Sequence, residues 1–146
     1  MQIKNSADGY FGVKIIEAKP KSDTRKRSVS ENISLRFILN QRSYYKPNKS
    51  SMLPIMQKIS YFFSSSVKSY SKKINLNDML TISVQSIDKL EFIVYYFNKY
   101  PLMGNKAKDF KYWEKVYNMI LTKQHLTEKG ILEIKLIASL LKDNKT

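Results

Sequence analysis

The amino-acid sequence predicts an α+β fold in which helices cover one face of a four-stranded antiparallel sheet. Residues 11–16 and 33–40 alternate apolar with other side chains, which is typical of half-buried strands. Residues 52–63 instead carry apolar side chains at helical spacing, and two further strand-like segments follow them. The predicted order is therefore strand, strand, helix, strand, strand and then helices. Antiparallel sheets can leave one face open to a partner.

The first two predicted strands are joined by a long basic connection. The strands cover residues 10–17 and 33–40, and residues 18–31 between them contain Pro20 and a run of three cations. This connection is predicted to be a hairpin tip that projects positive charge. An isolated basic tripeptide is more often a solvated surface loop, and that alternative stays open.

The first helix and the second strand pair follow in order. Ser50 and Ser51 are predicted to cap the helix, because a serine hydroxyl at this position accepts a backbone N–H bond. Pro54 is tolerated in a first turn, where its missing N–H has no helical partner. The next strands are predicted over residues 67–73 and 79–85, the latter with alternating apolar residues.

Three more helices complete the predicted fold. Ser86 is predicted to cap a helix that Pro101 stops, the next helix covers residues 109–123, and Thr127 caps the last. The expected buried stripes are Ile87, Leu90, Val94 and Phe97 in the first helix, Phe110, Trp113, Tyr117, Ile120 and Leu121 in the second, and Ile131, Ile134, Ile137, Leu140 and Leu141 in the third.

Length and charge narrow the class of protein. A chain of 146 residues has the size of one ordinary domain, so residues 1–146 are expected to form a single domain. A formal net charge of +14 favours a polyanionic partner, with nucleic acid ahead of a membrane surface. No apolar run approaches the roughly 18 residues that a membrane span needs. The absence of cysteine excludes disulfides and thiolate chemistry.

Asp8 is the first candidate for chemistry. The run Ala7-Asp8-Gly9-Tyr10-Phe11 leads directly into the first predicted strand, and a metal-dependent nuclease needs a carboxylate beside its nucleic-acid surface. An Asp-Gly pair is more often a simple turn, so this feature by itself leaves both interpretations open.

Several motifs together carry a resemblance to a known family. They are the Ala-Asp-Gly-Tyr-Phe opening, the order of strands and helices, residues 100–106 followed by Asp109-Phe110 and Trp113, and residues 125–130 before the last helix. From Ala7 onward the chain resembles a LAGLIDADG homing endonuclease or intron maturase domain, close to the C-terminal half of fungal mitochondrial double-motif members. The resemblance implies a saddle-shaped sheet that lies in the major groove of DNA.

The resemblance also implies roles for individual residues. Asp8 matches the family's metal-binding carboxylate, with Mg2+ as the expected ion, Gln41 a polar residue that orients water, and Lys106 the basic residue that completes the active site. His125 is expected to be structural. Arg36 and Asn40 are expected to read base edges, while most of the lysines position the protein. The implied nucleic-acid contacts are Lys14, Arg25, Lys26, Arg27, Ser34, Arg36, Asn40, Arg42, Lys68 and Tyr70.

The opening departs from the family pattern. The family motif is a helix whose small residues let two copies pack together and bring two carboxylates over the cleavage site. Only Ser6-Ala7-Asp8-Gly9 of it remains here, so the motif helix is expected to be mostly missing over residues 1–7. No second copy of the motif occurs in the chain. Cleavage is therefore expected to require a homodimer or a second LAGLIDADG half.

Three functions remain open at this point. The first is a Mg2+-dependent, site-specific DNA endonuclease acting on double-stranded DNA. The second is a binding protein without cleavage, either an intron RNA maturase or an inactive DNA- or RNA-binding remnant. The third is an unstable relic. A composition rich in Lys, Asn, Ile and Tyr resembles that of AT-rich genomes, which together with the resemblance suggests mitochondrial localisation.

Overall fold

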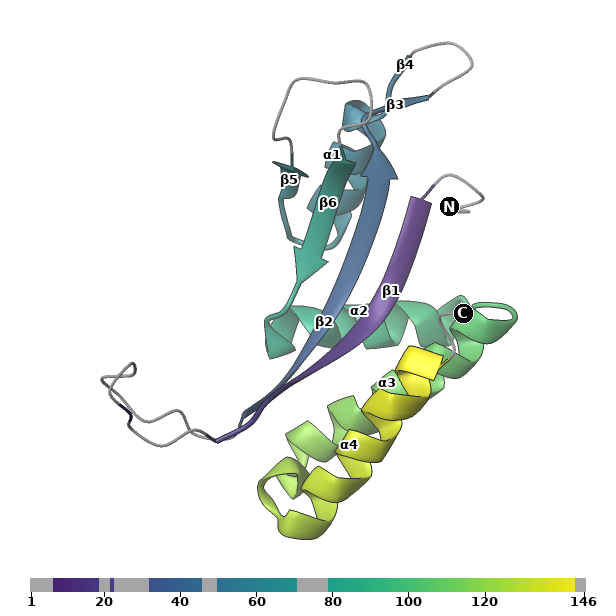
Figure 1. Ribbon diagram of the computed structural model, residues 1–146. Coiled ribbons are helices and arrows are strands. Elements are labelled where there is room, and N and C mark those ends of the chain that lie inside the picture. The colour runs from purple at the N-terminus through teal and green to yellow at the C-terminus, as the bar shows by residue number, and fades with distance from the viewer. Residues whose placement is uncertain (1–6, 19–21, 23–31, 46–49, 71–78, 144–146) are drawn as a thin grey trace. The chain divides into compact units, whose positions relative to one another are not determined.

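The computed structural model describes residues 7–18, 22, 32–45, 50–70 and 79–143 (Figure 1). The contacts divide the chain into two compact units: unit 1 comprises residues 1–10 and 36–99, and unit 2 comprises residues 11–35 and 100–146. The elements in chain order are β1 (Ala7–Ile16), β2 (Asn32–Arg42), β3 (Tyr44–Tyr45), β4 (Ser50–Ser51), α1 (Leu53–Phe62), β5 (Val67–Tyr70), β6 (Met79–Val84), α2 (Ile87–Lys99), α3 (Asn105–Leu121), the 3-10 helix η1 (Gln124–Leu126) and α4 (Glu128–Asp143).

The sheet contains four strands in the order β1-β2-β6-β5. β6 pairs antiparallel with both β2 and β5. The α+β fold and the order strand, strand, helix, strand, strand are therefore confirmed. A separate two-stranded ribbon, β3 with β4, was not predicted, because two residues per strand are too few to show an alternating pattern.

β1 begins earlier than the sequence predicts. It covers Ala7–Ile16, so Asp8 and Gly9 lie within the strand, and the turn that was left open as an alternative does not form there. Gly9 lies against β2: a Cβ added to it would come 3.3 Å from Leu39 Cδ1 and 3.7 Å from the Ile38 carbonyl oxygen. Pairing with a neighbouring strand outweighs the local turn preference of an Asp-Gly pair.

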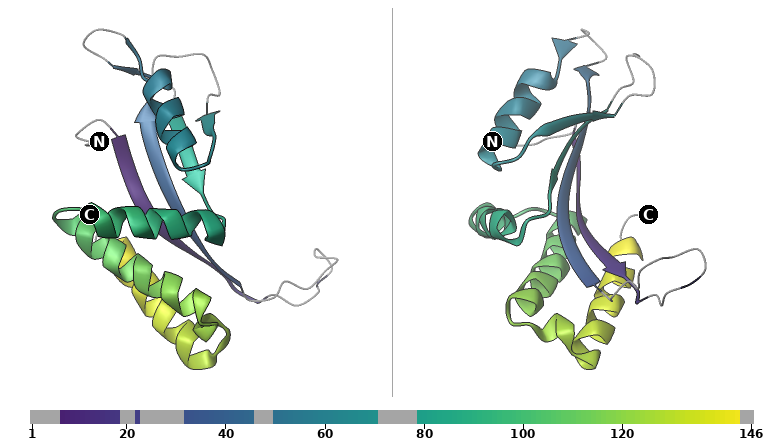
Figure 2. Two further views of the ribbon diagram at one scale, coloured as in Figure 1. Left: turned by 180° about the vertical axis from the view of Figure 1, so that it is seen from behind. Right: turned by 90° about the vertical axis from the view of Figure 1, so that its left-hand side faces the viewer.

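One face of the sheet in unit 1 is covered by α1 and α2, which lie on the same side of β2 and β6 (Figure 2). Phe37 of β2 reaches both helices, with its ring centroid 5.6 Å from that of Phe63 and 5.7 Å from that of Phe97. Leu90 and Ile93 of α2 are fully buried. Val94 was predicted to be buried but is only half-buried, so the buried stripe of α2 is centred on Ile93 instead.

α1 begins without the predicted serine cap. Its N-cap residue is Met52, whose side chain makes no capping hydrogen bond. Ser50 and Ser51 form β4, and the Ser51 hydroxyl accepts a hydrogen bond of 3.2 Å from the Leu53 N–H. Pro54 occupies the first turn as predicted. The β3–β4 ribbon holds the serines extended, which moves the helix start one residue along the chain.

The core of unit 2 is built around Trp113 of α3. The indole ring is fully buried, with ring centroids of Phe11 and Phe110 5.3 Å and 6.3 Å away. Its N–H donates a hydrogen bond of 3.2 Å to the Gly12 carbonyl of β1. α3 starts at Asn105, four residues before the predicted start, and Leu121 is 54% exposed instead of buried.

α4 begins as the sequence predicts. The Thr127 hydroxyl accepts a hydrogen bond of 3.0 Å from the Gly130 N–H, which is an N-cap bond. Ile134, Ile137 and Leu141 of the predicted stripe are buried, while Ile131 and Leu140 are half-buried. Across the described part of the chain, no helix has the length and apolar character to cross a membrane.

Gly130 makes the turn before α4 sensitive to substitution. A Cβ at this position would overlap the backbone carbonyl of Gln124 and come 2.9 Å from the Thr127 hydroxyl oxygen. An ordinary helical Gly→Ala change stabilises by about 1 kcal/mol. Here we expect Gly130→Ala to destabilise by about 1–3 kcal/mol, because overpacking against backbone forces the turn to move.

Urea denaturation followed by circular dichroism measures this effect. Ser139→Ala, at an exposed position of the same helix, is the matched control and is expected to be neutral or slightly stabilising. If the Gly130→Ala protein were as stable as the wild type, the close approach of Gly130 to the Gln124 carbonyl would be contradicted.

Candidate nucleic-acid interface and catalytic residues

The uncovered face of the unit 1 sheet carries predicted contact residues from neighbouring strands. Directly paired residues of antiparallel strands share a face. Asn40 pairs with Thr81, and Thr81 pairs with Lys68, so these three form one row across β2, β6 and β5. Phe37 and Leu39 belong to the opposite, helix-covered face because side chains alternate along a strand. We call the surface opposite the helices in unit 1 the open face; its β2 residues are Arg36, Ile38, Asn40 and Arg42.

Two contacts hold polar side chains on the open face. The Thr81 hydroxyl donates a hydrogen bond of 2.7 Å to the Asn40 Oδ1 atom. The Arg36 guanidinium lies 5.8 Å from the centroid of the Tyr10 ring, a cation–π contact. Arg36 Nε is buried and has no hydrogen-bond acceptor among the described residues. Both side chains are therefore oriented by neighbours on adjacent strands.

Exposure differs along the open face. Arg42 and Lys68 are exposed, Arg36 and Asn40 are half-buried, and Ile38 is only 8% exposed. The two exposed cations are free to reach a polyanion, whereas the half-buried pair is held in place. Sequence reasoning did not assign Thr81 or Tyr10 to the interface. The alternation in residues 79–84 indicates that Thr81 faces outward, but only the strand register shows that it bonds to Asn40.

Unit 2 contains two more of the predicted contacts. Lys14 of β1 is exposed and Ser34 of β2 is half-buried, each on the side of its strand opposite Phe11 and Leu35. The predicted contacts Arg25, Lys26 and Arg27 lie outside the described residues. The backbone of Tyr70 lies in β5, where it pairs with Met79 of β6.

Asp8 and Gln41 lie on neighbouring strands of unit 1. Gly9 approaches Ile38 and Leu39, so the antiparallel direction brings Asp8, one residue earlier, toward the Gln41 end of β2. At about 3.3 Å per residue the two backbones are roughly two residues apart along the strands. Lys106 belongs to unit 2, where it is exposed in the first turn of α3.

The side chain of Gln41 is buried on the helix-covered side of β2. It is 5% exposed and pairs with Leu80 of β6. Its Nε2 atom donates a hydrogen bond of 3.3 Å to the Arg42 carbonyl, while its Oε1 atom accepts none from the residues that the structure describes. A buried acceptor without a partner costs about 1–3 kcal/mol. Gln41, the residue predicted to orient water, therefore has a side-chain oxygen without a partner among the described residues. Its side chain does not lie on the open face.

The donor set suits a hard cation. Mg2+ takes oxygen ligands and prefers the charged carboxylate; Asp8 carries a carboxylate, and Gln41 carries a neutral amide oxygen. The partnerless Gln41 Oε1 atom is an observation in favour of such a fit. Among the described residues, no three His, Cys, Asp or Glu side chains gather into a metal-binding group. His125 is half-buried in η1. Its Nδ1 atom is buried and has no hydrogen-bond partner among the described residues.

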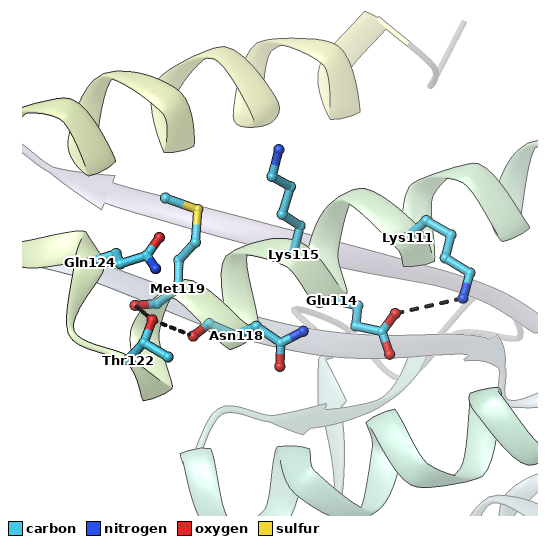
Figure 3. A pocket seen from close by; sticks show the side chains of 7 residues that line it. All are labelled: Lys111, Glu114, Lys115, Asn118, Met119, Thr122 and Gln124. Carbon is cyan, nitrogen blue, oxygen red and sulfur yellow. Dashed lines mark hydrogen bonds and ion pairs between the residues drawn. The ribbon is translucent and has the colours of Figure 1, made fainter.

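An open groove of about 350 Å3 runs along α3 in unit 2 (Figure 3). None of the predicted site residues lines it. Its lysines are neutralised locally, since Lys111 lies 3.6 Å from Glu114 and Lys115 lies 2.6 Å from Glu133 of α4. The lining residues are Lys111, Glu114, Lys115, Asn118, Met119, Thr122 and Gln124. The groove therefore offers a ligand no concentration of unpaired charge.

Comparison with known proteins gives consistent matches. Residues 5–117 match the family model described as LAGLIDADG endonuclease. Probable intron-encoded endonuclease 3 of Neurospora crassa is 31% identical over 132 residues, which make up 89% of this chain and 24% of that protein. The homing endonuclease I-LtrWI, solved with its target DNA, is 27% identical with a TM-score of 0.68, covering 93% of this chain and 40% of that one.

The fold is that of the LAGLIDADG homing endonucleases of known structure. I-TnaI, for example, has a TM-score of 0.66 at 21% identity, covering 95% of this chain and 87% of that one. The chain belongs to the LAGLIDADG endonuclease family, as the family model shows. It spans 24% of the length of the Neurospora relative and 40% of that of I-LtrWI.

Proposed function

We propose that this chain binds double-stranded DNA with its open face and acts as one half of a site-specific DNA endonuclease. The strand register carries this proposal, because it sets Arg36, Asn40, Arg42 and Lys68 on one uncovered face of three adjacent strands. The major groove is wide enough for strands. A formal charge of +14 favours the association, and I-LtrWI was solved bound to its target DNA.

Individual side chains suit different parts of that recognition. Arg36, steadied by Tyr10, has the fork geometry that reads guanine, and the Asn40 amide suits adenine. Because the Asn40 Oδ1 atom accepts a hydrogen bond from the Thr81 hydroxyl, the Asn40 amide nitrogen is the group that would donate to a base acceptor. Arg42 and Lys68 are exposed and suit backbone phosphates, as do Lys14, Arg25, Lys26 and Arg27 by resemblance.

The proposed chemistry is hydrolysis of a phosphodiester bond. By resemblance, Asp8 would hold Mg2+, which would stabilise the charge that develops on the attacking and leaving oxygens. By resemblance, Gln41 would orient a water molecule and Lys106 would stabilise negative charge at the scissile phosphate.

Cleavage of both strands needs two such carboxylates. This chain carries one copy of the motif residues Ala7-Asp8-Gly9, so we propose that a second LAGLIDADG half or a second copy of the chain supplies the other. The Neurospora relative is named as intron-encoded, and we propose a mitochondrial location for this protein as well.

A second candidate function is nucleic-acid binding without cleavage, as an intron RNA maturase or an inactive remnant. The observation in its favour is the burial of Gln41 on the helix-covered side, which separates it from the open face. Asn40, Arg36 and Arg42 would then serve binding alone.

Salt-dependent binding to duplex DNA tests the proposed interface. The double variant Arg42→Ala/Lys68→Ala removes two exposed cations from the open face. We expect the slope of log K against log salt to fall in magnitude by about 2, because each phosphate contact contributes about 0.9. The measurement is fluorescence anisotropy with a duplex selected from a randomised library.

The matched control is Lys129→Ala/Lys135→Ala, which removes the same charge from exposed positions on α4. Its slope is expected to stay close to that of the wild type. Equal losses in the two double variants would mean that net charge alone drives binding, and the open face would lose its assignment.

A further inference from the structure

The helix side of unit 1 exposes a cluster of aromatic rings. Tyr61 is 87% exposed, Tyr95 58%, Phe62 43% and Phe92 37%. We call these four residues of α1 and α2 the aromatic face. Large exposed apolar side chains grouped on one surface usually mark a binding site. None of the four belongs to the open face, because α1 and α2 cover the other side of the sheet.

Three of these rings, Phe62, Phe92 and Tyr95, form a continuous path between the two helices. The Phe62 centroid lies 5.1 Å from that of Phe92, which lies 6.3 Å from that of Tyr95. Phe62 also contacts Tyr96 at 5.3 Å, and Phe63 beneath it packs on Phe92 at 6.2 Å. The buried Phe63 and the half-buried Tyr96 therefore hold Phe62 and Phe92, so these two rings have little side-chain entropy left to lose on binding.

Cations accompany the aromatic face. The Lys99 ammonium lies 5.9 Å from the centroid of the Tyr95 ring. Lys58 is exposed one turn before Tyr61 on α1, and Lys89 is exposed on α2. Asp88 and Glu91 lie in the N-terminal half of α2 and offset part of this charge. Exposed rings accompanied by lysines on the same two helices match a ligand that offers both π-faces and phosphates.

The area of the aromatic face argues against a protein partner. Added together, the exposed fractions of the four side chains correspond to little more than two fully exposed rings. At about 200 Å2 for each side chain, the exposed area is roughly 450 Å2. A standard protein interface buries about 800 Å2 per partner. Unpaired bases need much less, since each base stacks on a single ring.

We propose that the aromatic face binds unpaired bases of single-stranded nucleic acid. This site is separate from the duplex-binding open face and does not depend on cleavage. A strand bound there stacks its bases on Tyr61 and Tyr95, while Lys58 and Lys99 contact its phosphates. The protein then holds a duplex and a single strand at the same time, on opposite sides of the unit 1 sheet.

The test uses a fluorescein-labelled, unstructured 20-nucleotide RNA and a DNA of the same sequence. Binding to the full chain is measured with unlabelled duplex DNA in excess, so that the open face is occupied. We expect Tyr61→Ala/Tyr95→Ala to weaken single-strand binding by about 5- to 150-fold for each ring removed. Tyr61→Phe/Tyr95→Phe should bind as the wild type does, because stacking needs the ring and not the hydroxyl.

The control variant is Leu132→Ala/Leu136→Ala, which truncates two side chains on α4 that are 67% and 62% exposed. It should bind the single strands with unchanged affinity. Tyr95→Trp adds a direct signal, because stacking of a base on an exposed indole quenches its fluorescence, whereas Trp113 is fully buried.

Several results would overturn the proposal. One is wild-type affinity of Tyr61→Ala/Tyr95→Ala for both oligonucleotides. Another is loss of single-strand binding when duplex DNA is present, which would place both ligands on the open face. A third is a changed sedimentation coefficient for Tyr61→Ala/Tyr95→Ala with unchanged affinity for the single strands. That result would mean that this surface is a protein interface. Equal binding of RNA and DNA, or a preference for RNA, supports the site.

Discussion

Replacing Asp8 with asparagine is expected to abolish DNA cleavage while leaving DNA binding intact. The neutral amide is a poor ligand for Mg2+, and loss of the metal removes several kcal/mol of transition-state stabilisation. At about 1.4 kcal/mol for each factor of ten, the rate of nicking should fall by about a thousandfold or more. The measurement is single-turnover nicking, in Mg2+, of a duplex site selected by binding.

The matched control is Asp88→Asn, at an exposed position in the first turn of α2. This variant should cleave at the wild-type rate. Cleavage by Asp8→Asn at that rate would remove Asp8 from the metal site. If the wild type nicks no selected duplex, alone or with a second LAGLIDADG half, the endonuclease proposal fails and the binding function remains.

Truncating Trp113 to alanine is expected to cause the largest loss of stability. The indole is fully buried, contacts Phe11, Phe110 and Tyr117, and donates a hydrogen bond to the Gly12 carbonyl. Removing a buried aromatic side chain costs about 3–5 kcal/mol. Domains are stable by only about 5–15 kcal/mol, so Trp113→Ala should remove a large part of the free energy of unfolding.

Urea titration followed by far-UV circular dichroism measures this loss without relying on tryptophan fluorescence. Trp113→Phe keeps a ring but removes the N–H donor, and we expect it to cost about 1–3 kcal/mol by leaving the Gly12 carbonyl unpaired. Leu132→Ala at an exposed site should change stability by less than about 0.5 kcal/mol. If Trp113→Ala lowered the free energy of unfolding by less than Trp113→Phe does, this result would contradict the packing described for unit 2.

Strong periodicity explains why most elements were predictable. Ile33, Leu35, Phe37 and Leu39 alternate over a whole strand, and all four are buried in β2. Thr127 caps α4 through a local hydrogen bond that needs no tertiary partner. Such features depend on residues a few positions apart, so a linear pattern contains them.

Errors occurred where distant residues decide the outcome. Asp8 and Gly9 have local turn preference, but they extend β1 because β2 lies beside them. Leu121 fits the helical stripe of α3, yet it is 54% exposed, while Val116 and Met119 are buried in that helix. Pairing and packing partners of this kind come from other parts of the chain, and the pattern of one segment does not reveal them.

The candidate site was predictable only in part. The outward positions of Arg36, Asn40 and Arg42 follow from alternation, and Lys68 joins them through the pairing of β5 with β6. The hydrogen bond from Thr81 to Asn40, the contact of Arg36 with Tyr10 and the Gln41 oxygen that has no partner among the described residues were not visible in the sequence. Each depends on which strands are neighbours and in which register.

The sequence by itself determined the family, the four strands, the helix spacing and the strong positive charge, because these are properties of local pattern and composition. Only the tertiary structure decided which cations share a face, which polar atoms are buried without a partner and which aromatic rings stay exposed. The physical reason is that burial, hydrogen bonding and charge depend on contacts between residues far apart in the chain, such as Asn40 and Thr81.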